Sequence, residues 1–108
     1  MLTVIETPEF ITWAPRVWSD KEREEFINWI AVNPDAGDVM QESGGLRKVR
    51  WGRQGVGKRG GARVIFYTFD ERGEVLLLLV YAKAKFDNIS TATLKAIKEK
   101  FDARQKSR

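Results

Sequence analysis

Val75-Leu-Leu-Leu-Leu-Val-Tyr-Ala82 is the longest apolar run in the chain and the stretch that decides the fold. Successive residues of a strand face opposite sides of a sheet, so a strand that is apolar at every position needs cover on both faces. The run therefore predicts a strand in the middle of a sheet, with other elements packed above and below it. It is far too short to cross a bilayer, so no membrane partner is expected.

Further strands are predicted on the N-terminal side of this run. The alternation in Leu46–Trp51 and Ala62–Phe69 predicts two of them, and Asp70-Glu-Arg-Gly73 is typical of the turn that joins the second to the apolar run. Leu2–Ile5 alternates weakly and is expected to add a first strand. The polar, glycine-bearing segment Asp35–Gly45 is expected to be a loop.

Three helical segments complete the predicted order. Pro8 opens a short one that ends near Ala14, and Ser19-Asp-Lys-Glu22 is a capping box for a second, expected over Asp20–Val32. Asn88-Ile-Ser-Thr91 carries N-cap chemistry for a last helix. The order β-α-α-β-β-β-α predicts an α+β fold, in which N-terminal helices pack on a small, mainly antiparallel sheet and a C-terminal helix follows.

Composition limits the chain to one domain and excludes several kinds of site. With 108 residues and no linker or repeat, residues 1–108 are expected to form a single domain. There is no Cys, and the N-terminus lacks the pattern of a signal peptide, so a cytoplasmic protein is expected. There is no His either, which removes the usual acid–base residue and nearly all zinc sites. No metal and no cofactor are expected.

Positive charge gathers in the second half of the chain. From Ser43 to Phe69 there are seven Lys or Arg residues and no Asp or Glu. Residues 1–45 carry nine acids against three bases, whereas residues 46–108 carry sixteen bases against six acids. Such charge favours a polyanionic partner, and the interleaved aromatic side chains offer ring faces for bases. The sequence predicts binding to nucleic acid, with RNA as the first choice.

The candidate site residues are cations that neighbouring strands bring together. Lys48 and Arg50 share one face of their strand, whereas Trp51 takes the other face and could serve either the core or a nucleic acid. Cations on a strand face are often only the solvated side of a sheet, but here they flank a basic glycine-rich segment. The five candidate cations are Lys48, Arg50, Arg63, Lys83 and Lys85. The side chains proposed to bind RNA around them are Trp51, Arg53, Lys58, Arg59, Tyr67, Tyr81 and Phe86.

One motif in the basic stretch has a tempting but weak interpretation. Gly55-Val-Gly57-Lys-Arg-Gly60 matches the dinucleotide-binding pattern G-x-G-x-x-G. That pattern needs a helix N-terminus directly after it, to supply N–H groups to a phosphate. The residues that follow, Ala62–Tyr67, are β-forming, so an electropositive loop is the better interpretation.

Three blocks of the chain resemble the RelE/ParE superfamily of toxins from bacterial type II toxin–antitoxin systems, in particular its HigB-like (RelE/HigB) branch. They are Gly45–Trp51, Gly60–Tyr67 and Leu79–Ser90. The resemblance implies an mRNA interferase, a ribosome-dependent endonuclease that cuts translated mRNA without a metal and so inhibits translation. In that reaction the ribose 2′-hydroxyl attacks the adjacent phosphate, which leaves a 2′,3′-cyclic phosphate and a 5′-hydroxyl. The resemblance also implies a cognate antitoxin as partner, with a helix-turn-helix domain.

Carried over by position, the family's catalytic cations fall on Lys48, Arg50, Arg63, Lys83 and Lys85. The resemblance implies that Lys48 or Lys83 is the base and that Arg50 and Arg63 stabilise the charged phosphorane. Many members carry a Tyr in the C-terminal segment, but the corresponding Ile89-Ser-Thr-Ala has none, and Tyr81 or Phe86 would take over base stacking. Two alternatives stay open: a non-catalytic ParE-like toxin that inhibits a protein such as DNA gyrase, and a plain RNA-binding module.

Overall fold

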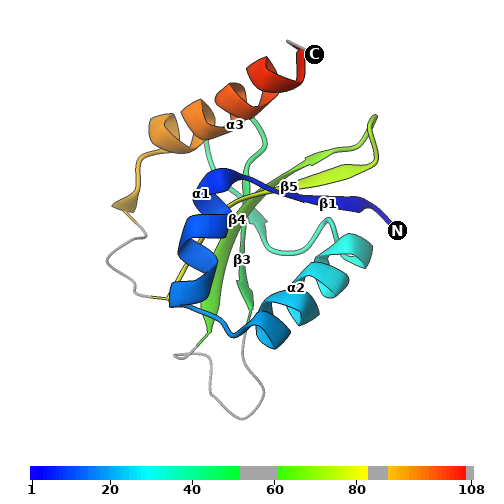
Figure 1. Ribbon diagram of the computed structural model, residues 1–108. Coiled ribbons are helices and arrows are strands. Elements are labelled where there is room, and N and C mark those ends of the chain that lie inside the picture. Colours follow the sequence, from blue (N-terminus) through cyan, green and yellow to red (C-terminus); the bar gives the residue numbers. More distant parts are fainter. Residues whose placement is uncertain (52–60, 83–87, 107–108) are drawn as a thin grey trace.

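Five strands form one mostly antiparallel sheet in the order β1-β5-β4-β3-β2. Figure 1 labels β1, β5, β4 and β3 of this sheet. The structure is a computed structural model, and it describes residues 1–51, 61–82 and 88–106. The elements in chain order are β1 (Thr3–Glu6), α1 (Pro8–Trp13), the 3₁₀ helix η1 (Ala14–Arg16), α2 (Asp20–Val32), β2 (Asp38–Val39), β3 (Arg47–Trp51), β4 (Ala62–Phe69), β5 (Glu74–Tyr81) and α3 (Thr91–Lys106). The predicted α+β fold is confirmed.

β5 is buried on both faces, as its unbroken apolar sequence predicts. Every residue of the strand after Glu74 is buried. β5 pairs with β4 in antiparallel orientation and with β1 in parallel orientation, so the first strand of the chain joins a late one. Thr7 reinforces this junction, because its hydroxyl donates to the carbonyl of Leu77 at 3.0 Å and accepts from the backbone N–H of Phe10. The start of α1 is thereby fixed to the sheet.

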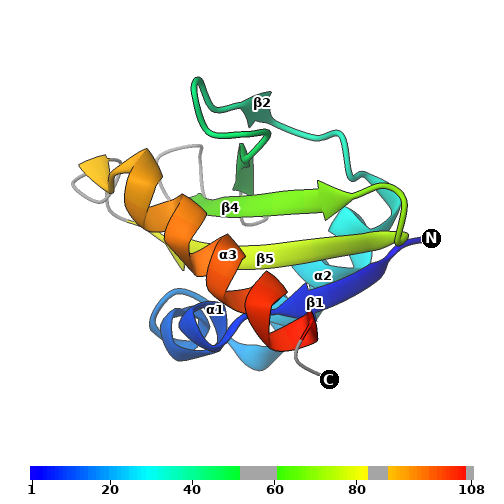
Figure 2. The ribbon, with the colours of Figure 1, turned by 90° about the horizontal axis from the view of Figure 1, so that it is seen from above.

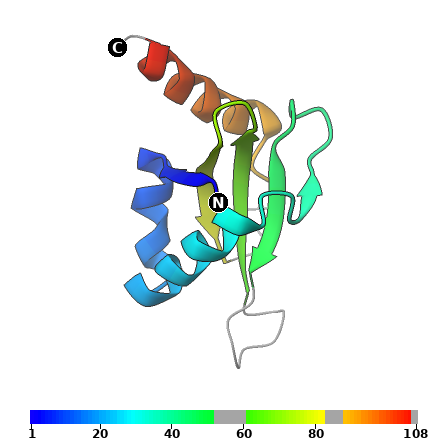
Figure 3. The same cartoon turned by 90° about the vertical axis from the view of Figure 1, so that its right-hand side faces the viewer.

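The two faces of the sheet carry separate cores. We call the first the α1–α2 face, because α1 and α2 lie together on that side (Figure 3). Its core is formed by large side chains of these helices and inward residues of the strands, namely Phe10, Trp18, Phe26, Ile30, Val49, Val64, Phe66 and Leu77. We call the second the α3 face. Its core comprises Leu46, Ile65, Leu76, Leu78, Leu79, Tyr81, Leu94 and Phe101.

The helix ends follow the local sequence chemistry. The capping box predicted for α2 is present: the hydroxyl of Ser19 accepts from the N–H of Glu22, and the carboxylate of Glu22 accepts from the N–H of Ser19. At the start of α3, the hydroxyl of Ser90 accepts from the N–H of Thr93. None of the helices in the described parts of the chain has the length and apolar character that crossing a membrane requires.

The expected loop Asp35–Gly45 contains a strand that the sequence did not indicate. β2 forms the edge of the sheet opposite β1 (Figure 2) and pairs with β3, with Asp38 opposite Lys48. Gly37, just before β2, has a φ of +73°, and a Cβ there would lie 2.3 Å from the carbonyl oxygen of Lys48. Only glycine accommodates both conditions, so the chain passes directly against the backbone of β3. A strand of two residues is too short to show a period, which is why it was predicted as loop.

Candidate functional site

Two arginines stand side by side on the α3 face. Arg50 of β3 is the register partner of Arg63 of β4, and Arg63 is in turn the partner of Tyr81 of β5. Directly opposite residues of antiparallel strands point to the same face, with Cβ atoms about 4.5–5.5 Å apart. Lys48 lies two residues before Arg50 and opposite Ile65 of the α3-face core, so it shares that face. We call Arg50 and Arg63 the basic row.

The basic row and Lys48 line one surface pocket of about 280 Å³. Its described lining residues are Gly37, Asp38, Lys48, Arg50 and Arg63, and we call it the basic pocket. Arg50 is exposed, whereas Lys48 and Arg63 are half-buried. Three of the five candidate cations therefore converge, as the strand positions predicted. Guanidinium groups suit such a place, because their planar N–H donors match the oxygens of phosphate.

The orientation of Arg63 is fixed by the backbone at the end of β5. Its Nη1 donates a hydrogen bond of 3.1 Å to the carbonyl oxygen of Ala82. A guanidinium that is already oriented loses less side-chain entropy when it binds an anion, which favours tight and specific contacts. Arg63 is therefore the more preorganised member of the basic row, and Arg50 is the more accessible one.

Asp38 is the site residue that sequence reasoning missed. The basic stretch contains no acid, and the charge there was expected to be uncompensated. The pairing of β2 with β3 places Asp38 opposite Lys48, and the same carboxylate residue lines the basic pocket. Two residues of strand offer no pattern from which this neighbour could have been found. The site is therefore a cationic pocket that also contains one acid among its described residues.

Trp51 belongs to the core and not to the basic pocket. It lies on the α1–α2 face, where its ring centroid is 4.6 Å from that of Trp29 and 5.6 Å from that of Phe26. Arg50, its neighbour in sequence, points to the opposite face. A base held by the basic row does not reach the Trp51 ring through the sheet. The partly buried Trp51 thus packs on the face opposite the basic row, and its assignment to the RNA-binding set stays a prediction.

The two candidate tyrosines also differ from expectation. Tyr81 is only 2% exposed, within the α3-face core, so no face of its ring is available to stack on a base and the stacking role is corrected. Tyr67 is half-buried, and Lys98 of α3 holds its Nζ 4.3 Å from the centre of the Tyr67 ring. Four residues of strand, roughly 13 Å, separate Tyr67 from Arg63. Tyr67 therefore lies beside α3 and outside the basic pocket.

The remaining predicted site residues lie outside the part of the chain that the structure describes. They are Arg53, Lys58, Arg59, Lys83, Lys85 and Phe86. Within the described ranges, no three His, Cys, Asp or Glu side chains are grouped so that they could hold a metal ion. No protein-family model matches the chain.

Proposed function

We propose that this chain is a metal-independent endoribonuclease, and specifically the toxin of a type II toxin–antitoxin system that cuts mRNA on the ribosome. The observation that supports the proposal is the convergence of Lys48, Arg50 and Arg63 in the basic pocket. Its partners in this proposal are the ribosome, the bound mRNA and a cognate antitoxin with a helix-turn-helix domain. Its place of action is the cytoplasm.

The geometry suits a phosphoryl-transfer reaction in which the substrate supplies its own nucleophile. The 2′-oxygen forms a bond to the adjacent phosphorus, and the bond from phosphorus to the 5′-oxygen breaks. The phosphorane formed on the way carries more negative charge than the starting diester. Preorganised guanidinium groups stabilise that charge more than they stabilise the ground state, and this difference lowers the barrier. In this proposal Arg50 and Arg63, which are register partners on β3 and β4, contact the two non-bridging oxygens.

The same geometry argues for the nuclease over a non-catalytic toxin of the same fold. A toxin that acts by binding a protein target needs a complementary surface, which is commonly aromatic and apolar at its centre. It has no need of three cations gathered in one pocket. Without an anionic ligand, Asp38 would offset only part of the repulsion among these three cations.

The proposal is tested on ribosomes stalled on a message of defined sequence. Wild-type protein is expected to cut that message, and primer extension together with product analysis should find 2′,3′-cyclic phosphate ends. Arg63→Ala, or Lys48→Ala combined with Arg50→Ala, is expected to slow cleavage by about a hundredfold or more. The loss of one transition-state cation costs on the order of 3 kcal/mol.

A matched control separates catalysis from folding and from net charge. Lys21→Ala removes one positive charge from an exposed position on α2 and is expected to leave cleavage unchanged. Urea denaturation of each variant shows whether it is folded. Folded pocket variants that cut as fast as the wild type would remove this site from consideration. A wild-type protein that arrests growth without producing cut messages would support the protein-binding alternative.

A further inference from the structure

β2 brings a carboxylate into a pocket that is otherwise lined by cations. Asp38 is the register partner of Lys48 across the β2–β3 pair, so the two side chains point to the same face with Cβ atoms about 4.5–5.5 Å apart. Asp38 is also the single acid among the described residues that line the basic pocket. Register and pocket lining are separate observations, and they agree on where this side chain lies.

The position of Asp38 is held from both sides by backbone contacts. The chain just before it is pressed against β3, because a Cβ on Gly37 would lie 2.3 Å from the Lys48 carbonyl oxygen. Arg47 donates to the carbonyl oxygens of Asp35 at 3.1 Å and Gly37 at 3.4 Å. Beyond β2, the N–H of Met40 donates to the carbonyl of Leu46 at 2.8 Å. The backbone at Asp38 is thereby held beside β3, while the Asp38 side chain is exposed and accessible to a substrate.

We propose that Asp38 and Lys48 are the acid–base pair of the endonuclease, an inference that rests on the proposed function. The Asp38 carboxylate takes the proton of the ribose 2′-hydroxyl as the 2′-oxygen bonds to phosphorus. The Lys48 ammonium gives a proton to the 5′-oxygen as the bond from phosphorus to that oxygen breaks. The products are a 2′,3′-cyclic phosphate and a 5′-hydroxyl, and solvent restores the Asp38 carboxylate and the Lys48 ammonium.

The direction of the two proton transfers follows from ordinary side-chain chemistry. At neutral pH a carboxylate is the form ready to accept a proton, and an ammonium is the form ready to donate one. This assignment reverses the role of base that the family resemblance implies for Lys48. It also supplies an acid for the leaving 5′-oxygen in a chain whose segment Ile89-Ser-Thr-Ala has no tyrosine. A base that acts on the 2′-hydroxyl restricts the substrate to RNA.

The first test compares Asp38→Asn with Asp35→Asn. Asp35 lies in the segment just before β2 and is exposed. It is not among the described residues that line the basic pocket, so its variant makes the same charge change outside the site. Asp38→Asn is expected to lower the rate at saturating message by about a hundredfold or more. The same variant should bind a 2′-O-methyl RNA, which lacks the reacting hydroxyl, more tightly than the wild type, because a negative charge next to the phosphate is removed. Asp35→Asn should change neither quantity.

A merely structural role for Asp38 predicts a different result. Loss of β2 would weaken RNA binding and stability together with the rate, and that outcome would overturn the proposal. So would an Asp38→Asn protein that cuts at the wild-type rate. In that last case the wild type and the variant both cut the message, so the proposed function stands while the inference fails. A wild-type protein that cuts no message overturns both.

A second test identifies the acid. A message with sulfur in place of the 5′-bridging oxygen has a leaving group that departs as a thiolate and needs little protonation. Lys48→Ala should be slow on the ordinary message and should recover most of the wild-type rate on the sulfur-substituted one. Asp38→Asn should remain slow on both. If sulfur substitution changed the cleavage rates of the two variants by the same factor, Lys48 would not be the acid and Asp38 the base.

Discussion

At the scale of single residues, Gly37 shapes the geometry of the site through a close backbone contact with β3. It lines the basic pocket and lets the chain approach the backbone of β3 closely enough to set Asp38 opposite Lys48. Two separate conditions apply at this position, a left-handed backbone and an absence of space for a Cβ. Gly44 has the same φ of +73° but no neighbouring atom within 4 Å of where its Cβ would be. Substitution of these two glycines therefore separates the cost of a left-handed backbone, which both positions share, from the cost of a steric overlap, which arises at Gly37 and not at Gly44.

We expect Gly37→Ala to be far more damaging than Gly44→Ala. Both variants carry the cost of a left-handed alanine, about 1–2 kcal/mol. Gly37→Ala should lower the free energy of unfolding by a further 2 kcal/mol or so, because its Cβ would overlap the backbone of β3. Urea denaturation of the two variants measures the difference. Equal losses would mean that there is room for a Cβ at position 37, contrary to the 2.3 Å expected between that Cβ and the carbonyl oxygen of Lys48.

At the scale of elements, β3 has two faces with two different uses. Arg50 lines the basic pocket on the α3 face, and the next residue, Trp51, packs on Trp29 and Phe26 on the other face. The alternation of the strand was enough to predict this division. It was not enough to decide whether Trp51 serves the core or a nucleic acid. That choice depends on where α2 lies, and the sequence of β3 does not contain that information.

Neighbouring substitutions in β3 should therefore have opposite effects. Trp51→Ala should lower the free energy of unfolding by about 2 kcal/mol, somewhat less than for a fully buried aromatic, and leave the affinity for 2′-O-methyl RNA unchanged. Arg50→Ala should weaken RNA binding with little effect on unfolding, because its side chain is exposed. Urea denaturation and fluorescence anisotropy on the same two proteins test the pair. Loss of RNA affinity in a stable Trp51→Ala protein would return Trp51 to the binding surface.

The long elements were predictable and the short one was not. β4 has the predicted bounds, Ala62–Phe69, and the capping box at Ser19 begins α2 where expected. The prediction of β4 rests on a period of two along the strand. The prediction of the start of α2 rests on two polar side chains three positions apart, Ser19 and Glu22. β2 has two residues and exists because Gly37 permits a close tertiary contact. Asp38 was missed for the same reason. The burial of Tyr81 follows from the apolar run to which it belongs, and the stacking role suggested for Tyr81 conflicts with that prediction.

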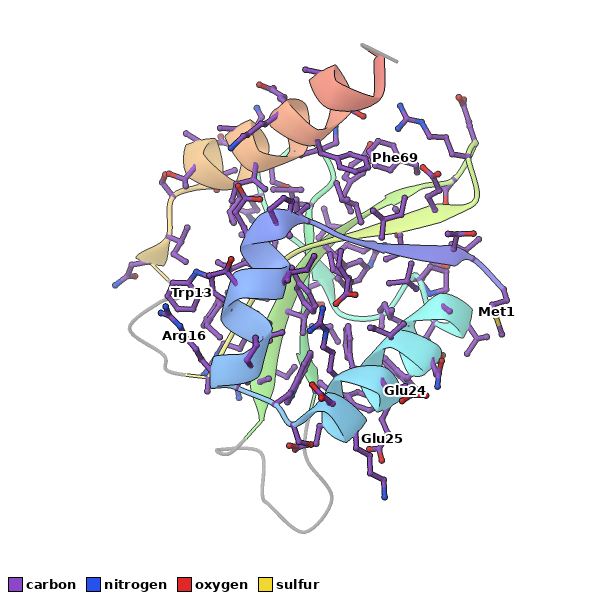
Figure 4. The ribbon with its side chains drawn as sticks, in the orientation of Figure 1. Met1, Trp13, Arg16, Glu24, Glu25 and Phe69 are labelled. Atoms are coloured by element: carbon purple, nitrogen blue, oxygen red, sulfur yellow. The ribbon has the colours of Figure 1, made fainter. Side chains whose placement is uncertain are left out.

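At the scale of the whole molecule, α2 has more acidic than basic side chains and lies on the side of the sheet away from the basic row. α2 carries Asp20, Glu22, Glu24 and Glu25 on the α1–α2 side, and Figure 4 shows Glu24 and Glu25 on the outer surface of this helix. The basic row and Lys48 lie on the α3 face. The three cations of the basic pocket attract a polyanion to the α3 face, which orients it before contact.

RNA affinity should therefore fall steeply as salt increases. Each phosphate contact with a single strand contributes a slope of about 0.7 log units in affinity per tenfold increase in salt, so the three pocket cations alone predict a slope of about 2. Lys48→Ala with Arg50→Ala should reduce the slope by about 1.4. Anisotropy with 2′-O-methyl RNA over a salt series measures both values. Glu24→Gln with Glu25→Gln is the control, and its slope should match the wild type. An unchanged slope in the double pocket variant would place the contacts elsewhere.

The parallel pairing of β1 with β5 bears on the order in which the protein is made. Residues 3–6 leave the ribosome early, yet their partners, residues 74–77, follow about seventy residues later. β5 completes this pairing, and it also contributes Tyr81, which is the register partner of Arg63 in the basic row. A nascent chain without β5 therefore lacks the strand that joins β1 to the sheet, and it also lacks the Ala82 carbonyl that orients Arg63. Under the proposed function, a ribosome translating this message is not exposed to a finished nuclease until most of the chain has been synthesised.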